Sequence, residues 1–155
     1  MLANATLKAR TVAARSISGA LVIACDTDVA LDGRVLGKPT GEREARATLE
    51  LLSGRTHEVL SGVAIAVGGD EPRTAIEVSR VRFRDLDPDL IELYLRSGEW
   101  RGKAGGYAIQ GLGSILVAGV EGDFSNIVGL PIGALRAMIP ELFAAATDNP
   151  PEPYS

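Results

Sequence analysis

The sequence is poor in the residues that characterise several protein classes. One cysteine in 155 residues excludes an intramolecular disulfide, and a single histidine leaves no cysteine–histidine cluster for zinc. No window approaches the ~18 consecutive apolar residues of a membrane span, and residues 1–10 lack the apolar core of a signal peptide. With 16 Lys and Arg against 20 Asp and Glu, the chain has no excess of positive charge for duplex nucleic acid. These absences predict a cytoplasmic protein that binds neither membranes nor nucleic acid.

The residues that are present predict a folded domain. Hydrophobic residues make up 46% of the chain, and a chain of this length can bury ~68–70% of the surface that it exposes when unfolded. Helices are predicted at about residues 2–15, 40–53, 87–98 and 131–145, with Pro140 dividing the last, and strands at about residues 20–25, 57–67, 76–83 and 114–120. We expect residues 1–147 to form one domain and residues 148–155, which hold three prolines, to be a disordered tail.

Local signals predict how these elements are joined. An Asp-Gly pair at residues 32–33 lies between two short apolar pieces, which predicts a hairpin. The apolar alternation of the third strand changes phase near residues 79–80, which predicts a bulge there. Residues 123–128 are predicted to be a short strand or a loop.

Asp26 is the carboxylate with the strongest indication of a functional role. The apolar run at residues 20–25 reads as a strand buried on both faces and ends on Asp26, so this side chain is predicted at the carboxyl end of a central strand, where α/β sheets bind ligands. Alternatively, Asp26 caps the strand end and hydrogen-bonds the turn that follows. Lys38 and Lys103 stand beside glycines and can present an ammonium group to phosphate, although a solvated loop lysine has the same pattern.

Three other side chains bear on the kind of chemistry that is possible. Gln110 can hydrogen-bond the edge of a base, or it can be a buried amide that the backbone satisfies. No Gly-x-Ser-x-Gly motif accompanies His57, so a structural role is predicted for it, and Cys25 is predicted to be an inert core thiol. A hard cation held by carboxylates is therefore the metal that the sequence favours.

Six short segments stand out in order along nearly the whole chain. They are residues 4–9 (NATLKA), 25–29 (CDTDV), 36–39 (LGKP), 53–59 (SGRTHEV) with 62–63 (GV), 103–111 (KAGGYAIQG) and 124–131 (FSNIVGLP). Each is weak alone, but together they resemble the Maf family, the septum-formation-inhibitor-like nucleotide pyrophosphatases. The form of the segment at 103–111 resembles the branch of the family that acts on dTTP and UTP.

The resemblance implies a fold, an activity and partners. The fold would be α/β, with a mixed twisted sheet, flanking helices and two lobes around a cleft, as in inosine triphosphate pyrophosphatases. The activity would be hydrolysis of the nucleoside triphosphates dTTP and UTP to the monophosphate and pyrophosphate. A divalent cation, Mg²⁺ or Mn²⁺, would be required, and the protein would be a homodimer.

The resemblance also implies roles for individual residues. Asp26 matches the family's catalytic aspartate, which would accept a proton from the attacking water or hold the metal. The lysines that neutralise phosphate charge during cleavage are matched by Lys8, Lys38 and Lys103. Thr27 and Gln110 match positions associated with the choice of base.

The sequence departs from the family pattern mainly before the Lys8 helix. The family opens with a strand and a Ser-x-x-Arg-Arg segment, followed by an acidic residue, and we expect these to belong to a missing amino-terminal segment. Gly102 and Ala108 are smaller departures, because related sequences often have aspartate and glycine there. The missing segment motivates an alternative function, a non-catalytic nucleotide-binding or division-associated protein. Another base specificity is a third hypothesis.

Overall fold

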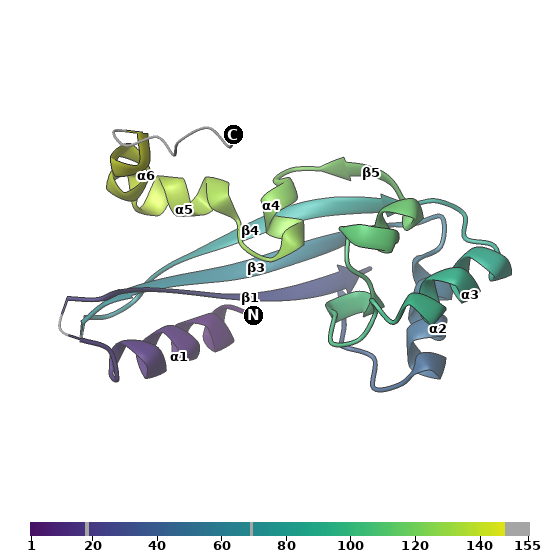
Figure 1. Ribbon diagram of the computed structural model, residues 1–155, viewed down its shortest axis with the longest axis horizontal. Helices are drawn as coiled ribbons and strands as arrows, with labels where there is room; N and C mark the ends of the chain where they lie inside the picture. Colours follow the sequence, from purple (N-terminus) through teal and green to yellow (C-terminus); the bar gives the residue numbers. More distant parts are fainter. Residues whose placement is uncertain (18, 69, 148–155) are drawn as a thin grey trace, which may run out of the picture.

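The computed structural model of the chain describes residues 1–17, 19–68 and 70–147, with the backbone alone for residues 145–147. Within these residues, a five-stranded sheet in the order β2-β1-β3-β4-β5 forms the centre of the molecule (Figure 1). Its strands are β1 (Leu21–Leu31), β2 (Arg34–Leu36), β3 (Thr56–Val67), β4 (Arg73–Phe83) and β5 (Val117–Glu121). The helices are α1 (Leu2–Ala13), α2 (Glu42–Leu52), α3 (Pro88–Ser97), α4 (Phe124–Val128), α5 (Ile132–Met138) and α6 (Pro140–Thr147), with short 3-10 turns η1 (Ala104–Gly106) and η2 (Gly111–Leu116).

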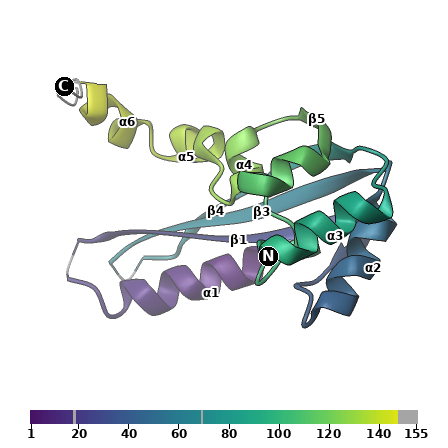
Figure 2. The same ribbon diagram turned by 45° about the vertical axis from the view of Figure 1, so that its right-hand side comes forward.

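Helices lie on both faces of the sheet and at one end of it (Figures 1 and 2). α1 packs on one face, α4 and α5 pack on the other, and α2 and α3 lie together at the end of the sheet where β1 and β4 end. The predicted α/β class with flanking helices is confirmed. All four strand pairings in the described residues are antiparallel, so this sheet is antiparallel rather than mixed.

Small residues bring α1 close to the sheet. Ala5, Ala9 and Ala13 recur every four residues on one face of the helix and are buried against the strands. Gly62 on β3 faces the start of the helix, where an added Cβ would lie 2.7 Å from the Cα of Leu2. Because there is no room for larger side chains, the polar residues beside the alanine stripe are held close to β1.

The opposite face of the sheet carries two hydrophobic clusters. The larger joins the sheet to α2, α3 and the two 3-10 turns, and its fully buried side chains include Phe83, Tyr94, Leu49, Leu95 and Leu116. Each such side chain contributes roughly 1.5–3 kcal/mol through burial. The smaller cluster holds α5 to the sheet and consists of Val63, Ile65, Leu135 and Ile139. These clusters fix the two groups of helices on either side of the candidate site.

The hairpin after β1 is confirmed, but β1 itself is longer than predicted. Asp32 and Gly33 have φ values of 50° and 76° and connect β1 to its antiparallel partner β2. The strand continues through Asp26 as far as Leu31, so the prediction that Asp26 ends the strand is wrong. Asp26, Thr27 and Asp28 are consecutive polar residues within β1, and polar residues within a strand have the same sequence pattern as a strand end.

One edge of β1 is open over most of its length. β2 pairs with β1 only at residues 29–31, so residues 21–28 have no strand partner on that edge within the described residues. Leu21 and Ile23 are 41% and 36% exposed. The prediction that this apolar run is buried on both faces is therefore wrong.

The bulge predicted near residues 79–80 is absent. β4 pairs with β3 without interruption from Arg73 to Arg82, and the described irregularity lies instead at the end of β4, where it meets β5. Val78 is exposed and Val81 is buried. The change of phase therefore reflects which face of the sheet is covered at each point, and not an extra residue in the strand.

The last third of the chain contains more helix than predicted. The strand predicted from residue 114 begins only at Val117, because η2 precedes it. The predicted strand or loop at residues 123–128 is the short helix α4, which Asp123 caps by accepting the N–H of Ser125 at 2.7 Å. α5 and α6 are separate helices that meet at Pro140, as predicted. None of the helices in the described residues is long and apolar enough to cross a membrane, and the predicted tail at residues 148–155 lies outside those residues.

Candidate functional site

Six side chains that the sequence analysis singles out line one cavity of about 300 Å³. They are Lys8, Asp26, Thr27, Lys38, Lys103 and Gln110. The cavity lies on β1 and β3, between the glycine-rich loop that follows α3 and the helix α4. Its volume is at the lower end of the range for small-molecule sites, which is roughly 300–1,000 Å³. The fold thus brings to one site residues that the sequence separates widely.

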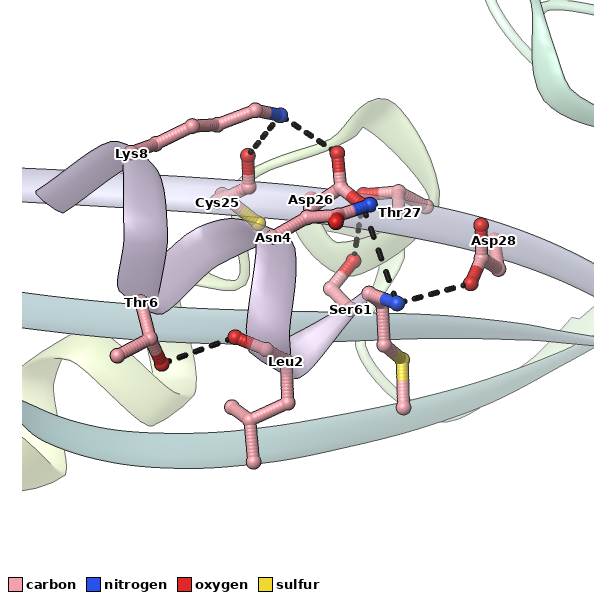
Figure 3. A network of polar contacts seen from close by, with 10 residues as sticks. Leu2, Asn4, Thr6, Lys8, Cys25, Asp26, Thr27, Asp28 and Ser61 are labelled. Atoms are coloured by element: carbon pink, nitrogen blue, oxygen red, sulfur yellow. Dashed lines mark hydrogen bonds and ion pairs between the residues drawn. The ribbon is translucent and has the colours of Figure 1, made fainter.

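Two side chains from α1 hold Asp26. Lys8 Nζ donates to Asp26 Oδ1 at 2.5 Å, and Asn4 Nδ2 donates to Asp26 Oδ2 at 2.9 Å (Figure 3). Lys8 Nζ also reaches the carbonyl oxygen of Cys25 at 3.5 Å. Asn4 and Lys8 are one helical turn apart, so a single face of α1 directs both donors to one carboxylate. The alternative in which Asp26 caps a strand end does not fit these contacts.

The same contacts keep Asp26 ionised. Burial by itself raises the pKa of Asp26, but the hydrogen bonds from Lys8 and Asn4, with the positive charges of Lys8 and the N-terminal ammonium, lower it further than burial raises it. The pKa of Asp26 therefore lies below its ordinary value, and the side chain is 20% exposed. At neutral pH the group is a partly accessible carboxylate, which can act as a base or as a ligand to a cation.

Asp28 provides a second carboxylate beside Asp26. The two residues lie on the same face of β1, and the N-terminal ammonium of Met1 is 3.1 Å from Asp28 Oδ2 and 3.9 Å from Asp26 Oδ2 (Figure 3). The two carboxylates thus lie close together. The described residues contain no group of three or more Asp, Glu, His or Cys side chains arranged for a metal. Two carboxylates nevertheless fit Mg²⁺, which proteins commonly hold through one or two carboxylates and the phosphates of a substrate.

Thr27 points to the opposite side of β1 from Asp26. Its hydroxyl oxygen is 2.7 Å from that of Ser61, the residue directly across from it on β3. Ser61 is fully buried, whereas Thr27 is partly exposed and lines the cavity. The buried serine therefore orients a hydroxyl group at the base of the cavity.

The glycine-rich loop after α3 is fixed to its surroundings through its backbone. The N–H of Gly105 donates to the carbonyl oxygen of Gly37 at 3.0 Å. The N–H groups of Leu112 and Gly113 donate to the carboxylate of Glu99 at 3.1 and 3.2 Å. These bonds tie the loop both to the segment that carries Lys38 and to the end of α3.

Two tyrosines add further contacts to this loop. The N–H of Ala108 donates to the hydroxyl of Tyr94 at 3.1 Å. The hydroxyl of Tyr107 is 2.7 Å from Nε2 of His57, which is 1% exposed and does not line the cavity. The loop is thus held from α3 and from β3.

Lys38, Lys103 and Gln110 extend from this framework into solvent. All three are exposed, and none has a hydrogen bond or ion pair through its side chain to another described residue. Gln110 is therefore not a satisfied buried amide. Two ammonium groups and an amide remain available to a ligand in the cavity.

Apart from His57, for which a structural role is predicted, the polar partners around the cavity were not predicted from the sequence. Asn4 lies one turn before Lys8 on the same helix, so helical spacing alone could have placed it beside Asp26. Ser61 and Thr27 are 34 residues apart, and His57 and Tyr107 are 50 residues apart. Only the strand register and the path of the loop bring these pairs together, and the sequence carries no local signal for either.

Known proteins with similar sequences were compared with the chain as a whole. A family model described as Maf-like protein matches residues 1–142. The dTTP/UTP pyrophosphatase of Pyrococcus furiosus is 54% identical over 118 residues, which are 76% of this chain and 62% of that protein. Proteins of the same name from Myxococcus xanthus and Moorella thermoacetica are 52% identical over 132 residues and 50% identical over 138 residues. These matches cover 85% and 88% of this chain, and 66% and 71% of the respective relatives.

The matches cover most of this chain but a smaller share of each relative. The chain spans less than two thirds of the length of the Pyrococcus furiosus protein and of a relative from Methylococcus capsulatus, which is matched over 56% of its length. The family model nevertheless extends from the first residue to α6 and includes every side chain of the cavity. On this evidence the chain belongs to the Maf-like protein family.

Proposed function

We propose that this chain hydrolyses dTTP and UTP to the nucleoside monophosphate and pyrophosphate. The observation that carries the proposal is the convergence of an ionised carboxylate and three lysines on one cavity. Such a cavity suits a polyanion whose charge redistributes as a phosphoanhydride bond breaks. The relatives are named dTTP/UTP pyrophosphatases, which supports the same substrates and the same reaction.

The proposed mechanism gives each cavity residue a task. Lys38 and Lys103, which have no partner among the described residues, bind the phosphates and neutralise the charge that develops on cleavage. Asp26 accepts a proton from the attacking water, and Lys8 keeps Asp26 ionised and oriented. Thr27 and Gln110 bind the base. A divalent cation such as Mg²⁺ or Mn²⁺, held by Asp26 and Asp28, would supply further neutralisation of the phosphates.

Replacement of the carboxylate of Asp26 tests this assignment. Asp26→Asn keeps the shape of the side chain but removes the base, so kcat for pyrophosphate release from dTTP should fall by about 10²–10⁴-fold. The assay is pyrophosphate release with Mg²⁺ present. Asp32→Asn is a matched control, because Asp32 pairs with Arg55 at the hairpin turn outside the cavity. Wild-type turnover by Asp26→Asn would refute the role of Asp26.

A second candidate function is nucleotide binding without turnover. It is favoured by the fact that both oxygens of Asp26 are already hydrogen-bonded, Oδ1 to Lys8 and Oδ2 to Asn4. A carboxylate engaged in this way is less free to accept a proton from water. If dTTP raises the thermal unfolding temperature of the wild-type chain and no pyrophosphate is released, this second function is the correct one.

We also propose the assembly and location that the family resemblance implies. Residues 1–147 would form one domain that pairs as a homodimer, which sedimentation velocity would measure directly. One cysteine in 155 residues is compatible with the reducing cytoplasm, where nucleoside triphosphates are abundant. A monomer at micromolar concentration would contradict the proposed dimer without affecting the proposed reaction.

A further inference from the structure

His57 and Tyr107 form a buried polar contact directly behind the candidate site. His57 Nε2 and the hydroxyl oxygen of Tyr107 are 2.7 Å apart, and the two residues are 1% and 6% exposed. Tyr107 lines the cavity, whereas His57 does not. The contact therefore connects a wall of the cavity to a residue in the interior of the sheet.

Apolar rings surround this contact. Phe83 packs edge-to-face against His57 and Tyr107, with ring centroids 5.0 and 4.8 Å away, and the two rings of the pair are 5.3 Å apart. His57 Nδ1 has no hydrogen-bond partner in the described residues. In an environment of this kind, a hydrogen bond is strong and a polar group that loses its partner is costly.

His57 is neutral in this environment. Burial lowers the pKa of His57 to about 4, so the imidazole carries no charge at neutral pH. Burial likewise raises the pKa of Tyr107 well above its ordinary value, so its hydroxyl keeps its proton. The contact is therefore a hydrogen bond between two neutral groups and not an ion pair.

Tyr107 stands between the two ligand-facing side chains of its loop. Lys103 is four residues before it and Gln110 is three residues after it. Among the hydrogen bonds of the described residues, the bond of Tyr107 to His57 is the one that joins a side chain of this loop to a strand of the sheet. A shift of Tyr107 would consequently move both ends of the loop with respect to β1.

We propose that His57 is a positioning residue for the nucleotide site, and that it acts through the hydroxyl of Tyr107 to place Lys103 and Gln110. The identity of the ligand in this inference rests on the proposed function. Without the imidazole, the Tyr107 hydroxyl is left unpaired among apolar rings. Because Tyr107 lines the cavity, its hydroxyl can regain a partner from water there, so Tyr107 turns toward the cavity and takes the loop with it.

This role of His57 predicts a characteristic order of KM values for dTTP among variants. His57→Leu should raise KM for dTTP about tenfold, because an unpaired buried hydroxyl costs enough to displace the loop. The change in kcat should be smaller, because Asp26 is held by α1 and not by this loop. His57→Gln retains an amide near the position of Nε2 and should restore most of the affinity. The double variant His57→Leu with Tyr107→Phe removes both polar groups and should bind dTTP better than His57→Leu alone.

The experiment combines kinetics with amide hydrogen exchange on the full chain. KM and kcat for dTTP are measured for the wild type and these variants, and exchange is followed at Gly105 and Ala108, whose N–H groups are bonded to Gly37 and Tyr94. Exchange at both amides should be faster in His57→Leu. Ser53→Ala is the matched control. The Ser53 hydroxyl accepts a hydrogen bond of 2.7 Å from the Leu86 N–H, and this contact lies outside the cavity. That variant should leave KM and the exchange of the loop unchanged.

Two results would overturn the inference. One is wild-type KM together with wild-type exchange at the loop in His57→Leu, and the other is a double variant as impaired as the single one. If His57→Leu does not fold, the single variants Tyr107→Phe and His57→Gln are compared instead. Tyr107→Phe loses the contact and should exchange faster at Gly105 and Ala108 than His57→Gln, which keeps a polar partner for the hydroxyl, and equal exchange in the two variants would overturn the inference. If the wild-type chain releases no pyrophosphate, the proposed function fails, and the exchange measurement alone then decides whether His57 orders the loop.

Discussion

The stability of the fold in mild acid should depend on His57. Burial lowers the pKa of this side chain from 6.5 to about 4, so between these values the unfolded chain binds a proton that the folded chain does not. Because the proton binds the unfolded state preferentially, stability is greatest above the unfolded pKa and is lost as the pH falls. His57 is the only histidine, and no other type of side chain ordinarily titrates in this window.

The size of the effect follows from the difference between the two pKa values. One pKa unit corresponds to about 1.36 kcal/mol, so the folded state should lose about 2 kcal/mol between about pH 7 and about pH 5, and about 3 kcal/mol by about pH 4. Folding also lowers the pKa values of four carboxyl groups, and these groups affect the stability of the fold at lower pH. They are Asp26, Glu44, Glu92 and Asp123.

Urea unfolding of the wild type and of His57→Gln at the two pH values measures this effect. Glutamine does not titrate, so the wild type should lose about 2 kcal/mol more than the variant between about pH 7 and about pH 5. Ser53→Ala lacks a different, partly buried hydrogen bond and should retain the full pH dependence of the wild type. Equal losses in the wild type and in His57→Gln would refute the reasoning, because the acid sensitivity would then arise elsewhere.

Three further substitutions test the packing and electrostatics around Asp26 and the loop. Gly62→Ala should destabilise the fold by about 1–3 kcal/mol in urea unfolding and reduce turnover, because the new Cβ would lie 2.7 Å from the backbone of α1 and push Lys8 away from Asp26. Lys8→Met should raise the pKa of Asp26, so the acid limb of the pH–rate profile should move to higher pH. Gly113→Ala should destabilise by a similar amount to Gly62→Ala and raise KM for dTTP, since its Cβ would lie 1.8 Å from the carbonyl oxygen of Ala108.

The sequence motifs predicted correctly which side chains line the cavity, but not where all of them lie in the secondary structure. All six predicted side chains line one cavity, although three of them lie on a helix or a strand and the other three on loops. Asp26, however, is in the middle of β1 and not at its end. A carboxylate that follows an apolar run has the same local pattern in both cases, and only α1, which packs over that face of the strand, distinguishes them.

The errors in secondary structure have a similar origin. Val78 and Val81 of β4 face opposite sides of the sheet, and the sequence pattern does not say that the face of Val78 is uncovered while that of Val81 is buried. α4 has only five residues, too few to establish a helical period. What the sequence lacked in each instance was information about which distant element covers a given residue.

The charges of the cavity give an independent reason to expect a divalent cation with the proposed substrate, a nucleoside triphosphate. Among the described residues that line it, Lys8 is paired with Asp26, which leaves the charges of Lys38 and Lys103 unbalanced. A nucleoside triphosphate carries a charge of about −4 at neutral pH, whereas its complex with Mg²⁺ carries about −2. The two free lysines match the charge of the complex, and the free triphosphate would bring an excess of about two negative charges close to the carboxylate of Asp26. We therefore expect the cavity to discriminate in favour of the magnesium complex through its lysines, even before Asp26 or Asp28 contacts the cation.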